Sequence, residues 1–253
     1  VQEKGIPMLT RAELLGQIMK NYKYAVGIAG THGKTTTTSM VTEILLAADM
    51  DPTISVGGIL NSIGGNIRVG DSELFVTEAC EYTNSFLSFF PTMEVILNIE
   101  EDHLDFFKDI HDIRNSFRQF AEKLPEDGLL VISSDIDNYR EITDGLACQV
   151  VTCGSQPSSD YSADNITYDE FARPAFDLMI GGEKAGRIRL GVPGEHNVYN
   201  ALAAIALCRK LDVSMENIRE GLLRFTGTNR RFEKKGELAG ITIIDDYAHH
   251  PRE

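Results

Sequence analysis

The sequence predicts an α/β protein in which a mostly parallel sheet is flanked by helices, and three observations lead to this prediction. Two nearly continuous apolar runs, Leu74–Thr77 and Met93–Ile99, are typical of strands in a parallel sheet that is covered on both faces. A third apolar run, Tyr24–Ala29, passes through a glycine-rich turn into a helical pattern, which is the order of a phosphate-binding loop. Alternating apolar and polar residues around Gly181 and Gly182 predict a small antiparallel β element, a hairpin.

The helices follow from apolar residues at helical spacing and from the signals at their ends. Thr10 is the expected N-cap of the first helix and Ser214 that of the last, while Asp51-Pro52 ends the helix after the glycine-rich turn. The stretch Glu195–Leu211 is strongly helical in pattern. In chain order, the predicted helices cover residues 12–19, 35–48, 109–124, 137–143, 195–211 and 215–225.

The strands follow from short apolar runs that are bounded by turn residues. Two glycine pairs between residues 57 and 65 indicate a small hairpin or loop near the glycine-rich turn, and residues 155–170 are expected to be polar and turn-rich. The predicted strands cover residues 24–29, 53–56, 74–77, 93–99, 128–133, 149–152, 175–180, 184–190, 230–240 and 241–245.

The composition is that of an ordinary globular protein, with 42% apolar and 25% charged residues. The net charge of −14 argues against nucleic acid as a partner, since general polyanion binders are basic. The cysteines at positions 80, 148, 153 and 208 lack metal-ligand spacing and indicate reduced thiols in a cytoplasmic protein. No apolar run approaches roughly 18 residues and no signal-peptide pattern is present, so no membrane association is expected.

The stretch Gly30–Thr36, GTHGKTT, indicates a phosphate-binding loop between the first strand and its helix. Its glycines let backbone N–H groups surround an anion at the positive end of the helix. Lys34 would reach the β- and γ-phosphates of a nucleotide, and the Thr35 hydroxyl would bind Mg²⁺. The spacing departs from the strict G-x-x-x-x-G-K-[ST] pattern, which has a glycine where Ile28 stands. A strand-to-helix turn rich in glycine and threonine, with an exposed lysine, is the alternative.

Polar side chains follow directly on the predicted parallel strands. Glu78 comes after Leu74–Thr77, and His103 lies in the acidic segment after the next strand. Because ligands gather at the carboxyl ends of strands in open α/β sheets, both should meet the phosphate-binding loop. Glu78 is the expected metal ligand, and the alternative is a solvated strand-end glutamate, of which Glu81 is an example. His103 either binds a metal as neutral imidazole or forms an ion pair, and His32 either donates to a phosphate or only spaces the loop.

Two asparagines follow a GEH turn at the start of a predicted helix. The side-chain amides of Asn197 and Asn200 donate and accept in one plane, which suits the edge of an adenine ring. Helix capping on an ordinary surface explains them equally well. Arg230 and Arg231 could stack on a base, bind a phosphate or lie on the surface. The residues alone therefore predict an ATP- or GTP-using enzyme with one or two metal ions, and they leave the phosphoryl acceptor open.

Six motifs occur in order over nearly the whole chain: GTHGKTT, EACEYTNSFL, ILNIEEDHLDFF, GEHNVYNALAA, GTNRRFE and DDYAHHP. Together they resemble the Mur ligases of peptidoglycan synthesis, and among these the members that add L-alanine. The resemblance implies an ATP-dependent, cytoplasmic bacterial enzyme that joins L-alanine to UDP-N-acetylmuramate through an acyl phosphate. It also implies two Mg²⁺ ions, which neutralise phosphate charge and align the donor with the acceptor.

The resemblance further implies roles for individual residues. Catalysis is expected of Lys34, Glu78 and His103. The metal ions are expected to contact Thr35, Glu78 and His103. The expected ATP-binding residues are Gly30, Thr31, His32, Gly33, Lys34, Thr35, Thr36, Asn197, Asn200, Arg231 and Asp246. The residues expected near the other two substrates are Ser85, Tyr247 and His249.

A piece of a three-domain enzyme is the organisation that the resemblance implies. Residues 1–230 correspond to the central ATP-binding domain, and residues 231–253 to the first strands of a truncated C-terminal domain that binds the amino acid. The N-terminal domain that binds UDP is expected to be absent, so the piece should bind nucleotide without ligating. Two alternatives stay open: a murein peptide ligase, which attaches a recycled tripeptide to the same sugar nucleotide, and a nucleotide-binding module without ligase activity.

Overall fold

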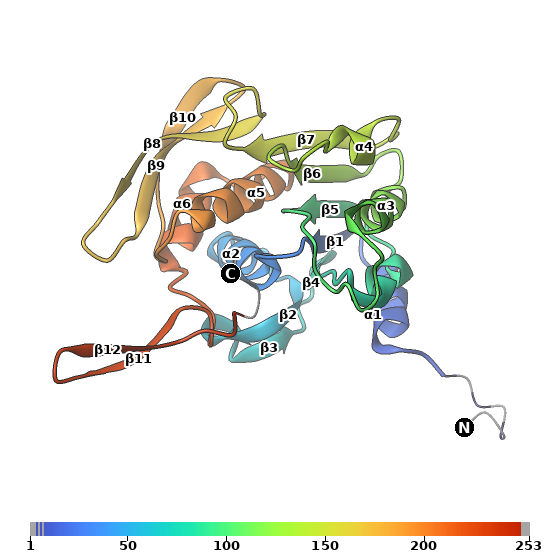
Figure 1. The fold of residues 1–253 in the computed structure, drawn as a ribbon, viewed down its shortest axis with the longest axis horizontal. Helices are drawn as coiled ribbons and strands as arrows, with labels where there is room; N and C mark the ends of the chain where they lie inside the picture. The colour runs from blue at the N-terminus through green and yellow to red at the C-terminus, as the bar shows by residue number, and fades with distance from the viewer. Residues whose placement is uncertain (1–3, 5, 7, 249–253) are drawn as a thin grey trace.

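A sheet of ten strands runs through the centre of the molecule (Figure 1). The computed structural model describes residues 4, 6 and 8–248, and within them the strand order is β10-β9-β8-β7-β6-β5-β1-β4-β2-β3. The seven strands from β8 to β2 in this order are parallel to one another. The strands β9 and β10 at one edge and β3 at the other are antiparallel. The prediction of a mostly parallel sheet with an antiparallel hairpin is confirmed.

The chain enters the sheet from a capped helix. The first helix, α1, spans Arg11–Met19, and Thr10 Oγ1 accepts the Glu13 N–H at 3.2 Å while the Glu13 carboxylate accepts the Thr10 N–H at 2.6 Å. The other helices are α2 (Lys34–Ala47), η2 (Asn61–Ile63), η3 (Tyr82–Ser88), α3 (Ile110–Ala121), α4 (Arg140–Thr143), α5 (His196–Lys210) and α6 (Met215–Arg224). None of the helices in this part of the chain has the length and apolar character needed to cross a membrane.

The strands of the large sheet mostly match the predicted apolar runs. They are β1 (Tyr24–Ala29), β2 (Thr53–Leu60), β3 (Gly65–Arg68), β4 (Leu74–Glu78), β5 (Met93–Ile96), β6 (Leu129–Ser133), β7 (Gln149–Gly154), β8 (Tyr161–Tyr168), β9 (Pro174–Ile180) and β10 (Glu183–Arg189).

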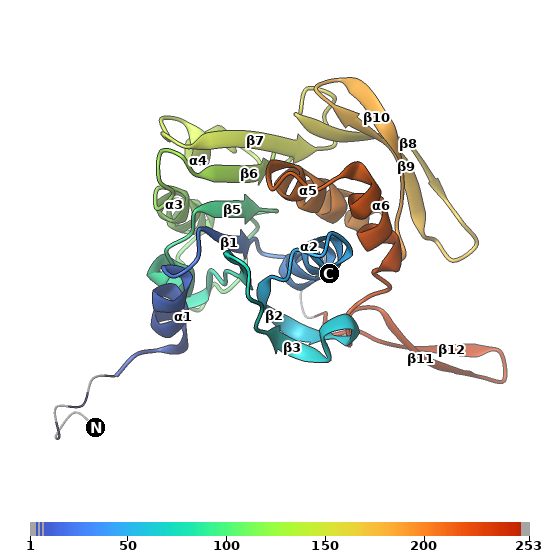
Figure 2. The same cartoon turned by 180° about the vertical axis from the view of Figure 1, so that it is seen from behind.

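Helices cover both faces of this sheet. The helices α2, α5 and α6 pack on one face, and α1, η3, α3 and α4 pack on the other (Figures 1 and 2). On the first face, Ile28 of β1 and Met40 of α2 belong to one buried apolar cluster. On the second face, the rings of Phe86 and Phe120 stack with centroids 4.5 Å apart. The sheet is therefore buried on both sides, as its continuous apolar strands predict.

The strand β1 lies between β5 and β4, so three strand ends that carry polar residues are neighbours. The parallel ladders pair Ile28 with Glu78 and Ala29 with Ile96. The residues that follow these pairs therefore emerge at the same edge of the sheet, where the loop after β1 also begins.

Three stretches of the large sheet differ from the sequence prediction. Residues 155–170 were expected to be turn-rich, but they contain β8, which is held by ladders to β7 and β9 despite its polar sequence. The strand predicted over 93–99 ends at Ile96, because Asn98 turns its side chain to the loop after β1. The strand β2 continues to Leu60, because it bends to pair there with β3.

A two-stranded hairpin, β11 (Glu233–Leu238) and β12 (Ile241–Asp245), follows α6 and extends away from the large sheet (Figure 1). It begins three residues later than the strand predicted from residue 230, because Arg230 and Phe232 take left-handed backbone conformations. Its apolar side chains are exposed, including Leu238 and Ile241. The assignment of this hairpin to a further domain stays a prediction.

Candidate active site

A loop with a glycine at each end joins β1 to α2. Gly30 and Gly33 have φ angles of 143° and 82°, which residues with a side chain rarely adopt. A Cβ at Gly33 would lie 2.6 Å from Asn200 Oδ1, so space as well as backbone conformation restricts this position to glycine. The first N–H groups of α2, from Lys34 to Thr36, have no carbonyl one turn earlier in the helix. Such an arrangement binds anions.

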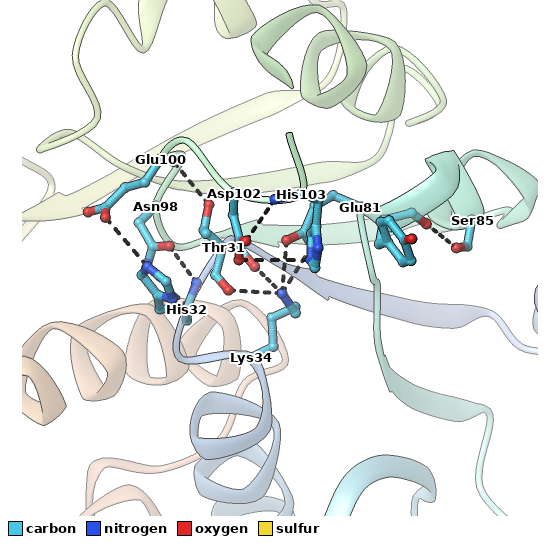
Figure 3. A network of polar contacts seen from close by, with 11 residues as sticks. Thr31, His32, Lys34, Glu81, Ser85, Asn98, Glu100, Asp102 and His103 are labelled. Carbon is cyan, nitrogen blue, oxygen red and sulfur yellow. Dashed lines mark hydrogen bonds and ion pairs between the residues drawn. The ribbon is translucent and has the colours of Figure 1, made fainter. Parts of the chain in front are cut away.

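The loop is fastened to the residues that follow β5. Asn98 Oδ1 accepts the His32 N–H at 2.7 Å, and Asn98 Nδ2 donates to the His32 carbonyl at 3.0 Å (Figure 3). Thr31 Oγ1 accepts the Glu100 N–H at 3.0 Å, and His32 Nε2 lies 3.4 Å from the Glu100 carboxylate. Sequence reasoning missed Asn98. Its position just after an apolar strand is the same signal that singled out the acidic residues.

Lys34 begins α2, and its ammonium points back into the loop (Figure 3). Lys34 Nζ donates to the carbonyls of Gly30 and Thr31, the second at 3.1 Å. It also lies 3.2 Å and 3.0 Å from the two carboxylate oxygens of Glu81. Glu81 is only 2% exposed, so the alternative of a solvated glutamate does not hold at this position. The chain turns into η3 directly after β4, and this turn carries the Glu81 side chain inward.

Glu78 and Thr35 lie against a glycine pair in β2. The Glu78 carboxylate accepts the Gly57 N–H, and a Cβ at Gly57 would lie 2.8 Å from a carboxylate oxygen of Glu78. A Cβ at Gly58 would lie 3.2 Å from Thr35 Cγ2. The absence of a side chain at Gly57 therefore leaves room for the Glu78 carboxylate, and its absence at Gly58 leaves room for the methyl group of Thr35.

His103 is fixed by its backbone and by an aromatic neighbour. It has a left-handed φ of 52°, and its N–H donates to Asp102 Oδ1 at 2.7 Å. The centroid of its ring lies 4.4 Å from that of Tyr82, which follows Glu81 in the chain. The Tyr82 hydroxyl donates to Asp105 at 2.8 Å, and this hydrogen bond raises the pKa of Tyr82. His103 is thus held on the side of the loop where the lysine and the buried glutamate meet.

The donor atoms suit a divalent cation that arrives together with a phosphate. Thr35 offers a hydroxyl and Glu78 a carboxylate, which are the hard oxygen ligands that Mg²⁺ prefers. Within residues 8–248, no three His, Cys, Asp or Glu side chains are grouped to hold a metal by themselves. Mg²⁺ is commonly held by one or two carboxylates and by the phosphates of a substrate, and the Thr35–Glu78 pair fits that pattern. The imidazole of His103 is a less usual ligand for this ion.

A cavity of about 1110 Å³ extends from the loop to α5 and is lined by Gly33 and Thr36 at the loop and by Asn197 and Asn200 on the helix. Asn200 Nδ2 donates to Asn197 Oδ1 at 3.1 Å, and Asn197 Nδ2 donates to the Pro193 carbonyl at 2.7 Å. Both asparagines are buried inside α5, one turn or less from its start. Capping on an ordinary surface is therefore not their role.

The segment around the C-terminal hairpin reaches the same cavity. Arg231 and Asp246 line it, and Asp246 Oδ2 accepts the Phe232 N–H at 2.7 Å. Neither Ser85 nor Tyr247 is among the described residues that line the cavity. The Ser85 hydroxyl donates to the carbonyl of Tyr82 in η3, and the Tyr247 ring packs 4.6 Å from the guanidinium of Arg230. His249 lies outside the described residues.

Comparison with known proteins gives a consistent result. The chain is 69% identical to the UDP-N-acetylmuramate–L-alanine ligase of Lachnospira eligens over 253 residues, which is all of this chain and 55% of that protein. Its fold matches the crystal structure of UDP-N-acetylmuramate–alanine ligase MurC from Thermotoga maritima with a TM-score of 0.84 and 30% identity, covering 99% of this chain and 57% of that one. A murein peptide ligase from Psychrobacter arcticus matches with a TM-score of 0.80 and 25% identity, covering 99% and 57%.

The chain thus spans about half the length of the curated relatives that it matches. The Mur ligase middle domain matches residues 28–208, which is more than half of the 253 residues and includes the loop, the acidic strand ends and both asparagines. This chain belongs to the Mur ligase family.

Proposed function

We propose that the chain is the nucleotide-binding part of an ATP-dependent ligase that joins L-alanine to UDP-N-acetylmuramate in the bacterial cytoplasm. The observation that carries the proposal is the 69% identity, over all 253 residues, to a UDP-N-acetylmuramate–L-alanine ligase. Because the chain spans 55% of that relative, the complete reaction is proposed for a longer protein that contains it. Residues 1–230 are proposed as the ATP-binding domain and residues 231–253 as the start of a domain for the amino acid.

ATP is proposed to lie along the cavity, with its phosphates at the loop and its base at α5. A volume of about 1110 Å³ is large enough for a nucleotide. The N–H groups at the start of α2 would bind phosphate oxygens, and the amides of Asn197 and Asn200 would meet the edge of the adenine. Arg231 and Asp246 would contact the nucleotide from the C-terminal side. Ser85, Tyr247 and His249 remain proposed for the other two substrates.

Two Mg²⁺ ions belong to the proposal. Thr35 and Glu78 would hold one of them, and His103 would approach the second. When bound, such ions supply neutralisation of the phosphate charge and alignment of the reacting oxygens.

The residues of the chain would act on the phosphoryl group through charge and position. A carboxylate oxygen of the muramoyl group takes the γ-phosphoryl group, and ADP leaves. The amino group of L-alanine then attacks the acyl carbon, phosphate leaves, and the amine gives up a proton to form the amide. Lys34 and the N–H groups of α2 would stabilise the charge on the transferred group, which is most of what phosphoryl transfer requires of a protein.

Removing the charge of Lys34 tests this proposal directly. In the longer protein, Lys34→Ala should lower kcat/KM for alanine-dependent phosphate release by at least about 100-fold, because one positioned cation is lost from the transition state. The variant should still unfold in one cooperative transition, since Lys34 is not part of the apolar core. As a control, Lys210→Ala at the end of α5 should keep its activity. Turnover close to normal in Lys34→Ala would show that the loop does not bind the phosphates as proposed.

A murein peptide ligase is the second candidate, and the structural match at a TM-score of 0.80 is the observation in its favour. Phosphate release by the longer protein, supplied with UDP-N-acetylmuramate and either L-alanine or a tripeptide, separates the two. Release with the tripeptide and none with alanine would replace the proposal by this candidate. Nucleotide binding without release in either case would leave only a nucleotide-binding module.

A further inference from the structure

The contact between Lys34 and Glu81 has a property that an ordinary surface ion pair lacks, which is burial. The side chain of Glu81 is 3% exposed and that of Lys34 is 17% exposed. An exposed pair contributes little and separates easily, whereas a buried pair that loses one partner leaves an uncompensated charge. Separating the Lys34 ammonium from the Glu81 carboxylate therefore costs more free energy than breaking an exposed ion pair.

The hydrogen-bonding capacity of the ammonium is already used. A lysine has three N–H donors and no acceptor. Four oxygens surround Lys34 Nζ: the carbonyls of Gly30 and Thr31 and the two carboxylate oxygens of Glu81, which lie at 3.2 Å and 3.0 Å. A phosphate oxygen can obtain an N–H only by replacing one of them. Glu81 supplies two of these four oxygens and the only negative charge among them, so a phosphate that takes its place exchanges one anion for another.

The position of the pair connects this exchange to the anion site. Lys34 is the first residue of α2, so its backbone N–H is one of the N–H groups proposed to bind the phosphates. Glu81 lies three residues after the end of β4 and 47 residues after Lys34 in the chain. A pair with a merely structural role would contribute to the stability of the fold. Here, the group that holds the ammonium also determines whether the ammonium is available to a phosphate.

We propose that Glu81 is a positioning residue that keeps the Lys34 ammonium folded back onto its own loop until a nucleotide phosphate takes the place of the carboxylate. The inference rests on the nucleotide-binding function proposed above. It assigns Glu81 a role different from that of Glu78, whose carboxylate contacts the Gly57 N–H and not the lysine. Glu81 competes with phosphate, and so it lowers the affinity of the site for the charged end of the nucleotide.

Binding of ADP and of adenosine, measured by titration calorimetry in EDTA, tests the proposal without a metal ion. Glu81→Gln should bind ADP at least about fivefold more tightly than the unaltered protein, because a charged hydrogen-bond acceptor has been replaced by a neutral one. Adenosine, which has no phosphate, should bind equally to both. Glu81→Asp keeps the charge but draws the carboxylate back by one methylene, and it should bind ADP at least about twofold more tightly.

The aspartate variant separates competition for the lysine from simple repulsion of the phosphates, because its charge is unchanged. Two controls extend this separation. Glu126→Gln removes the same charge at an exposed position outside the cavity and should change ADP binding by less than about twofold. In a Lys34→Met background, Glu81→Gln should lose most of its gain, because the ammonium for which the two anions compete is absent.

The outcomes are distinct. Tighter ADP binding by both Glu81 variants, dependent on Lys34, supports the proposal. If ADP binds the unaltered protein and binds the two variants no more tightly, or if the gain persists without Lys34, the role of Glu81 is overturned while nucleotide binding stands. If the unaltered protein binds neither ADP nor ATP, the proposed nucleotide function falls, and the role of Glu81 falls with it.

Discussion

At the scale of single residues, the side-chain amide of Asn98 takes the place of a backbone hydrogen-bonding partner. It accepts from the N–H of His32 and donates to the carbonyl of the same residue, as a neighbouring strand would. The N–H of His32 is thereby turned toward β5, and the N–H groups that remain for an anion are those at the start of α2. The conformation of the loop after β1 therefore depends on a side chain more than sixty residues away in sequence.

Loss of this amide should weaken phosphate binding specifically. Asn98→Ala is expected to lower the affinity for ADP by about tenfold, because two hydrogen bonds that fix the loop are removed. Affinity for adenosine should stay within about twofold, since the base would lie at α5. Calorimetric titration of both ligands measures the difference, with the exposed helix residue Asn115→Ala as the control. An equal loss for ADP and adenosine would show that Asn98 supports the whole cavity and not the loop alone.

The sequence identified most of the residues at the strand ends but not how they pair. A motif and the rule of strand carboxyl ends were sufficient to select Lys34, Glu78 and His103. The contact between Lys34 and Glu81 depends on how the chain turns after β4, where Thr83 and Asn84 have left-handed φ angles of 54° and 57°. Neither residue type requires that conformation, so the inward position of Glu81 is set by tertiary packing.

At the scale of elements, the strands and helices with strong periodicity were predictable, and those held by their neighbours were not. The sequence of β8, YSADNITY, has little apolar alternation, because much of this strand is exposed. It is a strand because β7 supplies a parallel partner and β9 an antiparallel one. The bend in β2 after Ser55 likewise follows from pairing with β3. Such elements can be recognised only once the rest of the sheet is in place.

The contact of α2 with α6 makes a prediction about stability. A Cβ at Gly221 of α6 would lie 2.4 Å from Ile44 Cα of α2, so the two backbones approach too closely for a side chain. Gly221→Ala should lower the free energy of unfolding by about 1–3 kcal/mol through overpacking, although alanine favours helix. Urea denaturation measures the change. Gly65→Ala, at a position with nothing within 4 Å of the added atom, is the matched control and should change stability by less than about 0.5 kcal/mol. Equal stability of both variants would contradict the close packing.

At the scale of the whole molecule, one ionisable group inside the sheet links folding to pH. Glu94 of β5 is completely buried, and within the described residues neither of its carboxylate oxygens has a hydrogen-bond partner. Burial raises the pKa of Glu94 well above the usual 4.5, and the charge of Lys123 opposes this shift only in part. The folded protein therefore keeps Glu94 protonated at a pH at which the unfolded chain has lost that proton.

The sign of the resulting pH dependence is fixed. Above the unfolded pKa of Glu94 the native state binds more protons than the unfolded state, so stability falls as pH rises toward the raised native pKa, by up to about 1.4 kcal/mol per pH unit. Glu94→Gln should remove this contribution. The free energy of unfolding of the variant minus that of the unaltered protein should therefore increase from pH 5 to pH 8. Urea denaturation at several pH values measures it, with the exposed Glu126→Gln as the control. A constant difference between Glu94→Gln and the unaltered protein over this range would mean that Glu94 is ionised in the fold.

The register of β4 has a consequence for which parts of the site can change position. Glu78 is the last residue paired in the β1–β4 ladder, opposite Ile28, so its backbone is held by the pairing of the sheet. One residue inserted within β4 would turn the acid to the opposite face, whereas residues inserted after Ala79 would leave it where it is. The lysine, in contrast, carries its charge on a four-carbon stem. Of Glu78 and Lys34, the acid therefore has its backbone held within the sheet, whereas the amine has the longer side chain with which to adjust to a ligand.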